Sequence, residues 1–126
     1  MGILLIIPQN PATTGIVSQA YGVTGPLGVG YIAGYLKKHN FDVSILDNNI
    51  ERLSREDFRT YLRKIKPGYI GLSLLTSAVN NALSFAAAAK EVNSQIKVIA
   101  GGPHASALPQ DVLGHEAIDV VVKGEG

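Results

Sequence analysis

The stretch that decides the fold is 69–75, YIGLSLL, together with 97–102, KVIAGG. Each contains a short, continuously apolar run, which is typical of a strand that is buried on both faces of a parallel sheet. Between them, residues 78–93 are rich in alanine and carry apolar residues at helical spacing. This alternation predicts a β-α-β unit, the building block of an α/β domain.

The same alternation extends outward in both directions. Helical spacing predicts a helix after Ser54, where Asp57 resembles the second member of a capping pair. Five strands and four helical segments result, and they predict a doubly wound, flavodoxin-like (Rossmann-like) parallel sheet of order 2-1-3-4-5 with helices on both faces. The other predicted strands are 1–8, 42–46 and 119–122, and the other predicted helical segments are 26–40, 54–65 and a short turn at 108–113.

Composition excludes several classes of protein. With 126 residues and 46% apolar residues, the chain suits a single domain, 1–126, with one core. The net charge of +1 and the scattered basic residues predict no nucleic-acid partner and no anionic membrane partner. The apolar runs are too short to span a bilayer, and no secretory signal is recognisable, so a cytoplasmic setting is expected. The absence of cysteine excludes disulfides, thiol catalysis and cysteine-ligated metal in this segment.

In a sheet of this kind, the ligand lies beyond the carboxyl ends of the strands. The predicted ends are small, rich in glycine and mostly uncharged, which indicates a bulky ligand with many amides and hydroxyls rather than a dense anion. The connection over 9–25 is long for a compact domain, and such loops are usually functional. The strand ends are 8–10, 47–49, 75–77, 101–104 and 124–126.

Two motifs at this edge indicate the ligand. Ser73-Leu74-Leu75 is an S-x-L triplet, and Gly101-Gly102 follows after 25 intervening residues. They resemble the second and third parts of the D-x-H-x-x-G, S-x-L, G-G pattern of cobalamin-binding domains of the methionine synthase and mutase type. A serine hydroxyl can bond the benzimidazole nitrogen of the cofactor's nucleotide tail. Paired glycines remove side chains where the tail passes the backbone.

The first part of that pattern is absent, because residues 26–30 read PLGVG without Asp or His. With this departure, the whole chain resembles the N-terminal domain of cobalamin-dependent radical S-adenosylmethionine proteins. That group includes the anaerobic magnesium-protoporphyrin IX monomethyl ester oxidative cyclase type and many methyltransferases. The resemblance is carried by PLGVGYIAGYL (26–36), ILD (45–47), IGLSLLT (70–76), NNAL (80–83), GGPH (101–104) and VVKGEG (121–126).

The resemblance implies that the chain binds cobalamin without a protein histidine on cobalt. It also implies that the chain is a fragment, followed by a radical domain with S-adenosylmethionine and a 4Fe-4S cluster. The chain would present cobalamin to that domain for methyl transfer or a related radical reaction such as oxidative cyclisation. No acid–base pair or nucleophile predicts turnover by this segment alone. The implied cofactor-binding residues are Ser73, Leu75 and Thr76 along the tail, Gly101, Gly102, Pro103 and His104 beside it, and Gln9, Asn10, Gly124 and Glu125 around the corrin.

Other readings of these residues stay open. Ser73 fits a buried strand with its hydroxyl bonded to backbone, the glycine pair fits a tight turn, and His104 fits a structural histidine. The G-x-G-x-x-x-G at 28–34 suggests a dinucleotide site, but that fingerprint directly follows the first strand, and here about twenty residues intervene. Its alternative is that the glycines bring the helix close to the sheet and to a bulky tail. Flavin binding at 13–15, Thr-Thr-Gly, and a pure interaction module are the remaining alternatives.

Overall fold

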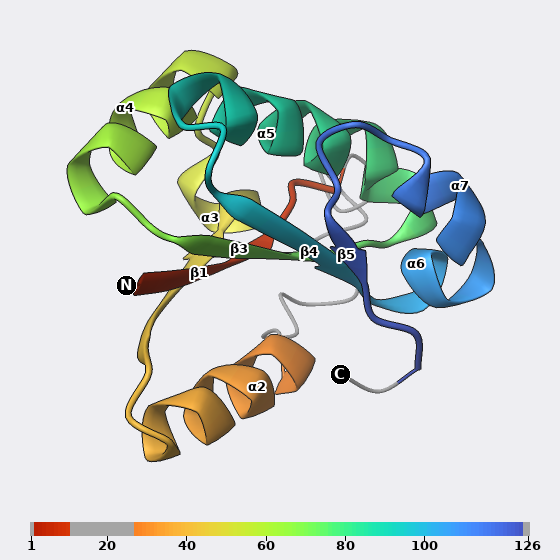
Figure 1. Cartoon of the computed structure of the whole chain (residues 1–126), viewed down its shortest axis with the longest axis horizontal. Helices are drawn as coiled ribbons and strands as arrows, with labels where there is room; N and C mark the ends of the chain where they lie inside the picture. The colour runs from red at the N-terminus through yellow and green to blue at the C-terminus, as the bar shows by residue number, and fades with distance from the viewer. Residues whose placement is uncertain (1, 11–26, 125–126) are drawn as a thin grey trace.

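The fold is a five-stranded parallel sheet in the predicted order β2-β1-β3-β4-β5 (Figure 1). The structure is a computed structural model, and it describes residues 2–10 and 27–124. The strands are β1 (Gly2–Ile7), β2 (Asp42–Asp47), β3 (Tyr69–Ser73), β4 (Lys97–Gly101) and β5 (Val120–Val121). The helices are α2 (Leu27–Lys38), α3 (Asn48–Glu51), α4 (Arg55–Ile65), α5 (Val79–Val92), α6 (Pro103–Ala107) and α7 (Pro109–Leu113), and the 3-10 turn η2 (Thr76–Ala78) precedes α5.

The main core lies between the sheet and the layer formed by α4 and α5 (Figure 1). Alternate residues of each strand point into it, because side chains of a strand alternate between its two faces. Phe58 of α4 and Phe85 of α5 stack there with their ring centroids 4.2 Å apart. Four of the five alanines of α5 are fully buried, so this helix lies close to the strands as its composition predicted. The strand residues in this core are Leu4, Ile6, Leu46, Ile70, Leu72, Val98 and Ala100.

Helix α2 covers the other face, on the side of β1 and β2. Its Ala33 packs with Leu5 and Val43, and the half-buried Val29 and Leu36 flank this smaller cluster. In the described part of the chain, residues of β1, β2 and α2 alone make up this cluster. The same face of β3, β4 and β5 therefore lies beside α2 rather than beneath it.

Local signals set the helix ends. Ser54 caps α4 by accepting a hydrogen bond from the Asp57 N–H at 3.1 Å, as the capping pair predicted. Two short helices were not predicted. Asp47 accepts from the Asn49 N–H at 3.0 Å and so starts α3 at the end of β2, while α6 begins with Pro103 at its first position.

Two predicted strand boundaries are wrong. Strand β3 ends at Ser73 rather than at 75, because Leu74 donates its N–H to Gly101 O and the chain then turns into η2. Strand β5 pairs over two residues only. The first helix is described from Leu27, so Pro26 and nearly all of the long 9–25 connection lie outside the described residues.

An ion pair joins α5 to the sheet. Lys90 Nζ lies 2.6 Å from Asp119 Oδ2, and this oxygen also accepts from the Val98 N–H at 2.8 Å. Burial raises the pKa of the Asp119 carboxyl, but the bonds from Lys90 and Val98 outweigh it, so the pKa lies below its ordinary value.

None of the helices described spans enough apolar residues to cross a bilayer.

Candidate functional site

The carboxyl ends of β1, β3 and β4 lie side by side, because β3 pairs with both of the other strands. The predicted site residues of the segments after these strands therefore share one edge. The segment after β5 also reaches this edge, since the Gly124 N–H donates to Ser106 Oγ at 2.9 Å. Glu125 lies outside the described residues. The topology thus brings together the motifs that the sequence places far apart.

The ends of β3 and β4 are joined beyond their strands by three contacts, which we call the β3–β4 junction. The Leu74 N–H donates to Gly101 O at 2.8 Å, and the His104 N–H donates back to Leu74 O at 3.0 Å. The third contact is between side chains, with Thr76 Oγ1 3.2 Å from His104 Nδ1. The S-x-L-L-T and G-G-P-H motifs are therefore two halves of one structural unit.

The two glycines of this junction meet different surroundings. Gly102 has φ +94°, and a Cβ there would lie 2.9 Å from both N and O of Leu74. Only glycine fits such a position without strain. A Cβ on Gly101 would have Val122 as its nearest neighbour, at 3.9 Å, which is ordinary contact. The tight-turn reading therefore describes Gly102, whereas nothing in the backbone requires a glycine at 101.

Ser73 lies on the face of the sheet that α2 partly covers. Its neighbours Leu72 and Leu74 belong to the main core on the opposite face, and side chains alternate along a strand. The residue is half-buried, so it is not sealed behind apolar neighbours. Its hydroxyl has no hydrogen-bond partner among the residues that the structure describes, so a bond from this hydroxyl to backbone is not observed there.

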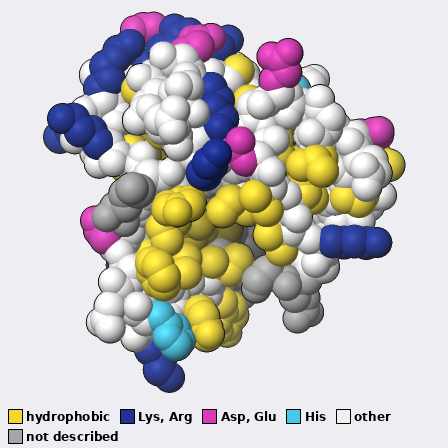
Figure 2. Space-filling model, viewed as in Figure 1, with side chains coloured by type: hydrophobic (Ala, Val, Ile, Leu, Met, Phe, Trp, Pro, Cys, Tyr) yellow, Lys and Arg dark blue, Asp and Glu magenta, His cyan; other side chains and the backbone are white. Residues whose placement is uncertain are grey.

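The ends of β3 and β4 carry no large side chain on this face. Ser73 pairs in register with Gly101. Gly71 does not extend this area, because a Cβ there would lie 2.7 Å from Leu5 Cδ2. We call Ser73 and Gly101 the bare strip. Figure 2 shows hydrophobic side chains gathered around a hollowed area between the sheet and α2. Tyr69, at the start of β3, and Val120 of β5 are among the large apolar residues left exposed.

The end of β1 is held by Asn49 and Asn81, which the sequence did not single out as site residues. The N–H of the buried Asn10 donates to Asn49 Oδ1 at 2.8 Å. Asn81 Nδ2 donates to Gln9 O at 2.8 Å. Asparagine beside a strand end is a turn signal, but spacing alone could not name these partners.

The remaining predicted residues complete a neutral edge. Leu75, Thr76, Pro103 and Gly124 are exposed, and His104 is half-buried. None of the predicted residues that the structure describes is Asp, Glu, Lys or Arg. The described residues contain no group of three His, Cys, Asp or Glu side chains that could hold a metal ion. Hydroxyl, amide, imidazole and backbone groups are what this edge offers to a ligand.

The interpretation of the α2 glycines as a means of close approach to the sheet is wrong. Gly28, Gly30 and Gly34 are exposed, and a Cβ on each would meet nothing within 4 Å in the described structure. The sheet-facing residues are the larger ones between them.

A dinucleotide site is not favoured either. Its glycines would directly follow the first strand, but α2 begins at Leu27, well after β1 ends at Ile7. Asp47, at the end of β2, caps α3.

A parallel sheet of this order, with a mostly uncharged, glycine-rich carboxyl edge, defines a flavodoxin-like ligand-binding domain. Residues 13–126 match the family model described as the B12 binding domain. The chain belongs to that family, which confirms the resemblance inferred from its motifs.

Three curated relatives place the family match in longer proteins. The chain is 35% identical over 128 aligned positions to an uncharacterized methyltransferase of Pyrococcus horikoshii, covering all of this chain and 27% of the relative. It is 36% identical to the anaerobic magnesium-protoporphyrin IX monomethyl ester cyclase of Rubrivivax gelatinosus, over 80% of this chain and 19% of the cyclase. It is 28% identical to the cytidylyl-2-hydroxyethylphosphonate methyltransferase of Streptomyces wedmorensis, over 96% of this chain and 26% of the relative. The chain thus spans roughly a fifth to a quarter of each.

Proposed function

We propose that this domain binds cobalamin with the nucleotide tail along the bare strip and the corrin over the carboxyl edge of the sheet. The half-buried Ser73 hydroxyl, which has no partner among the described residues, carries the proposal. A polar group in that position is costly unless a ligand or water satisfies it. The benzimidazole nitrogen of the tail is an acceptor for the hydroxyl proton.

The remaining residues fit the rest of the cofactor. Gly101 leaves room beside Ser73, where a larger side chain would occupy the face. The corrin carries neutral amide side chains, which the uncharged edge matches through the hydroxyl of Thr76, the imidazole of His104 and the exposed backbone around Gly124. The cobalt supplies the methyl-transfer or electron-transfer chemistry, and the protein binds and orients the group.

In the longer protein, the domain presents cobalamin to a radical S-adenosylmethionine domain with a 4Fe-4S cluster. This part of the proposal is supported by the relatives, whose names describe methyltransferases and a cyclase and whose chains extend well beyond this segment. The reaction class proposed is methyl transfer or a related radical reaction such as oxidative cyclisation. The 126-residue domain supplies the cofactor site in this scheme, and the chemistry on the substrate takes place in the longer chain.

Binding of hydroxocobalamin to the purified chain, followed by calorimetry and by the absorption spectrum after gel filtration, tests the proposal. Ser73→Ala removes one hydrogen bond and is expected to weaken binding by about tenfold. Gly101→Val fills the bare strip and is expected to abolish binding. Ser44→Ala, at an exposed position of β2, is the matched control and should bind as the parent chain does.

Cobinamide, which has the corrin but lacks the nucleotide tail, isolates the role of the strip. It is expected to bind more weakly than hydroxocobalamin and to be unaffected by Ser73→Ala. Binding of hydroxocobalamin that is unchanged by Gly101→Val would place the tail elsewhere. Absence of any binding to the parent chain would refute the proposal as a whole.

A further inference from the structure

His104 is held at the carboxyl edge from two sides. Its backbone N–H donates to Leu74 O at 3.0 Å, which fixes the start of α6 against the end of β3. Its ring Nδ1 lies 3.2 Å from Thr76 Oγ1. The other ring nitrogen, Nε2, has no hydrogen-bond partner among the described residues. The imidazole is half-buried, and within the described part of the chain one ring nitrogen is engaged while the other is not.

The partner of Nδ1 determines which nitrogen carries the proton in a neutral imidazole. A histidine that ligates a metal usually donates its other ring N–H to a carboxylate, a carbonyl or water. Here the described neighbour of Nδ1 is a threonine hydroxyl, which can donate its proton to Nδ1 or accept a proton from it. When this hydroxyl donates to Nδ1, the ring proton sits on Nε2. That tautomer is also the intrinsically more stable one for a neutral histidine side chain, so the arrangement in which Thr76 donates is favoured.

We propose that Thr76 holds His104 in the Nε2–H tautomer, so that His104 donates a hydrogen bond to an amide oxygen of the corrin and does not ligate cobalt. This inference rests on the proposed cobalamin site and deepens it. Thr76 is a positioning residue, because it acts through the imidazole. A protonated nitrogen has no lone pair for a metal, whereas the amide-rich rim of a corrin offers carbonyl oxygens that accept from N–H groups.

The tautomer is measurable in the free chain by long-range proton–nitrogen correlation spectra at about pH 8.5, where free imidazole is neutral. His115 is a built-in reference, because its Nδ1 accepts from the Ala117 backbone N–H at 3.3 Å and its ring proton must then sit on Nε2. We expect His104 to show the same pattern. Thr76→Val should weaken that preference, and Thr76→Ser should keep it. A proton on Nδ1 of His104 in the parent chain would overturn the proposal.

Cobalamin binding supplies the second measurement. His104→Ala is expected to weaken hydroxocobalamin binding by about fivefold to tenfold, because one hydrogen bond is lost. His104→Gln, which retains an N–H donor, should recover most of that loss. After reduction of the bound cobalt to the divalent state, the electron paramagnetic resonance spectrum should show no nitrogen splitting that depends on His104.

The outcomes separate this inference from the proposed function. If the parent chain and His104→Ala bind hydroxocobalamin equally, the cobalamin site stands and the donor role of His104 fails. Nitrogen splitting that disappears in His104→Ala would make His104 a cobalt ligand and would also overturn the inference. If the parent chain binds no cobalamin at all, the proposed function itself fails, whichever tautomer His104 adopts.

Discussion

Gly101 and Gly102 are neighbours at the end of β4, yet a side chain on each would meet different surroundings. Gly102 has φ +94° and ψ −179°, a backbone conformation that is essentially restricted to glycine. The Leu74 backbone also lies where its Cβ would be. Gly101 has room for a methyl group and is part of the bare strip. One motif therefore combines a residue that the fold requires with a residue that the proposed ligand requires.

Alanine substitutions separate these two requirements. Gly102→Ala is expected to lower the free energy of unfolding by at least about 1–3 kcal/mol, because it strains the backbone and crowds Leu74. Gly101→Ala should change stability by less than about 1 kcal/mol. Urea unfolding of both variants measures the difference. Equal losses at the two positions would show that the glycines share one structural role.

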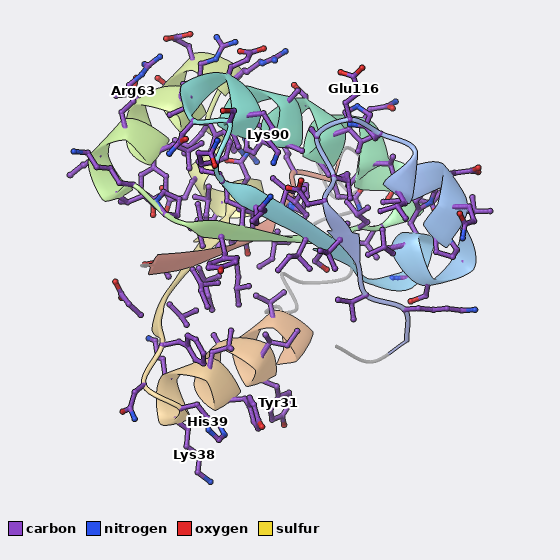
Figure 3. All side chains as sticks on the ribbon, viewed as in Figure 1. Tyr31, Lys38, His39, Arg63, Lys90 and Glu116 are labelled. Carbon is purple, nitrogen blue, oxygen red and sulfur yellow. The ribbon has the colours of Figure 1, made fainter. Side chains whose placement is uncertain are left out.

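At the scale of elements, α2 is an apolar helix with an exposed outer surface. Tyr31 and Tyr35 are 76% and 66% exposed, and Figure 3 shows Tyr31, Lys38 and His39 on the side of α2 away from the sheet. Of the α2 side chains that the structure describes, Val29, Ala33 and Leu36 pack in the small cluster against the sheet. The exposed glycines of α2 reduce its helical stability without a contact in the described structure that requires them.

Adding a methyl group to this surface should therefore stabilise the chain. Gly34→Ala is expected to raise the free energy of unfolding by about 0.5–1 kcal/mol, because alanine loses less conformational freedom in a helix and meets no neighbour here. The matched variant Ala33→Gly, on the buried stripe, should lower it by at least as much. Chemical denaturation of the two variants tests both signs. A loss of stability in Gly34→Ala would mean that position 34 is closely packed.

For the whole molecule, the contact of Lys90 with Asp119 ties the α5 layer to the strands at the far edge of the sheet. The pKa of the Asp119 carboxyl is lower in the folded chain than its ordinary value. Its stabilisation is therefore complete above the unfolded value of about 4 and is lost as the pH falls through the lower folded value. Protonation of Asp119 is therefore one of the ways in which acid lowers the free energy of unfolding.

Asp119→Asn is expected to lower the free energy of unfolding by about 1.5–3 kcal/mol at neutral pH, since a hydrogen-bonded charge is lost. The difference between the parent chain and the variant should shrink below about pH 4. Urea unfolding at several pH values measures both effects. Asp42→Asn, at an exposed position, makes the same charge change as a control. A difference that persisted unchanged in acid would contradict the role assigned to the carboxylate.

The strand order could be predicted because each strand is a short apolar run, and parallel strands joined by helices have few allowed arrangements. The ends of β3 at Ser73 and of β5 at Val121 could not be predicted, because the run of apolar residues continues past the point where strand pairing stops. The family could be recognised from Ser73 and the glycine pair. The separate roles of Gly101 and Gly102 could not be assigned from the sequence, because they depend on how closely the Leu74 backbone approaches Gly102.

The sequence by itself determined the class of fold and the family, because apolar periodicity and motif spacing are local properties of the chain. Only the tertiary structure decided that Ser73 and Gly101 lie side by side, that Gly102 packs on Leu74 and that Thr76 meets His104. These contacts join residues about 28 positions apart, and parallel pairing brings them together only when the whole sheet forms.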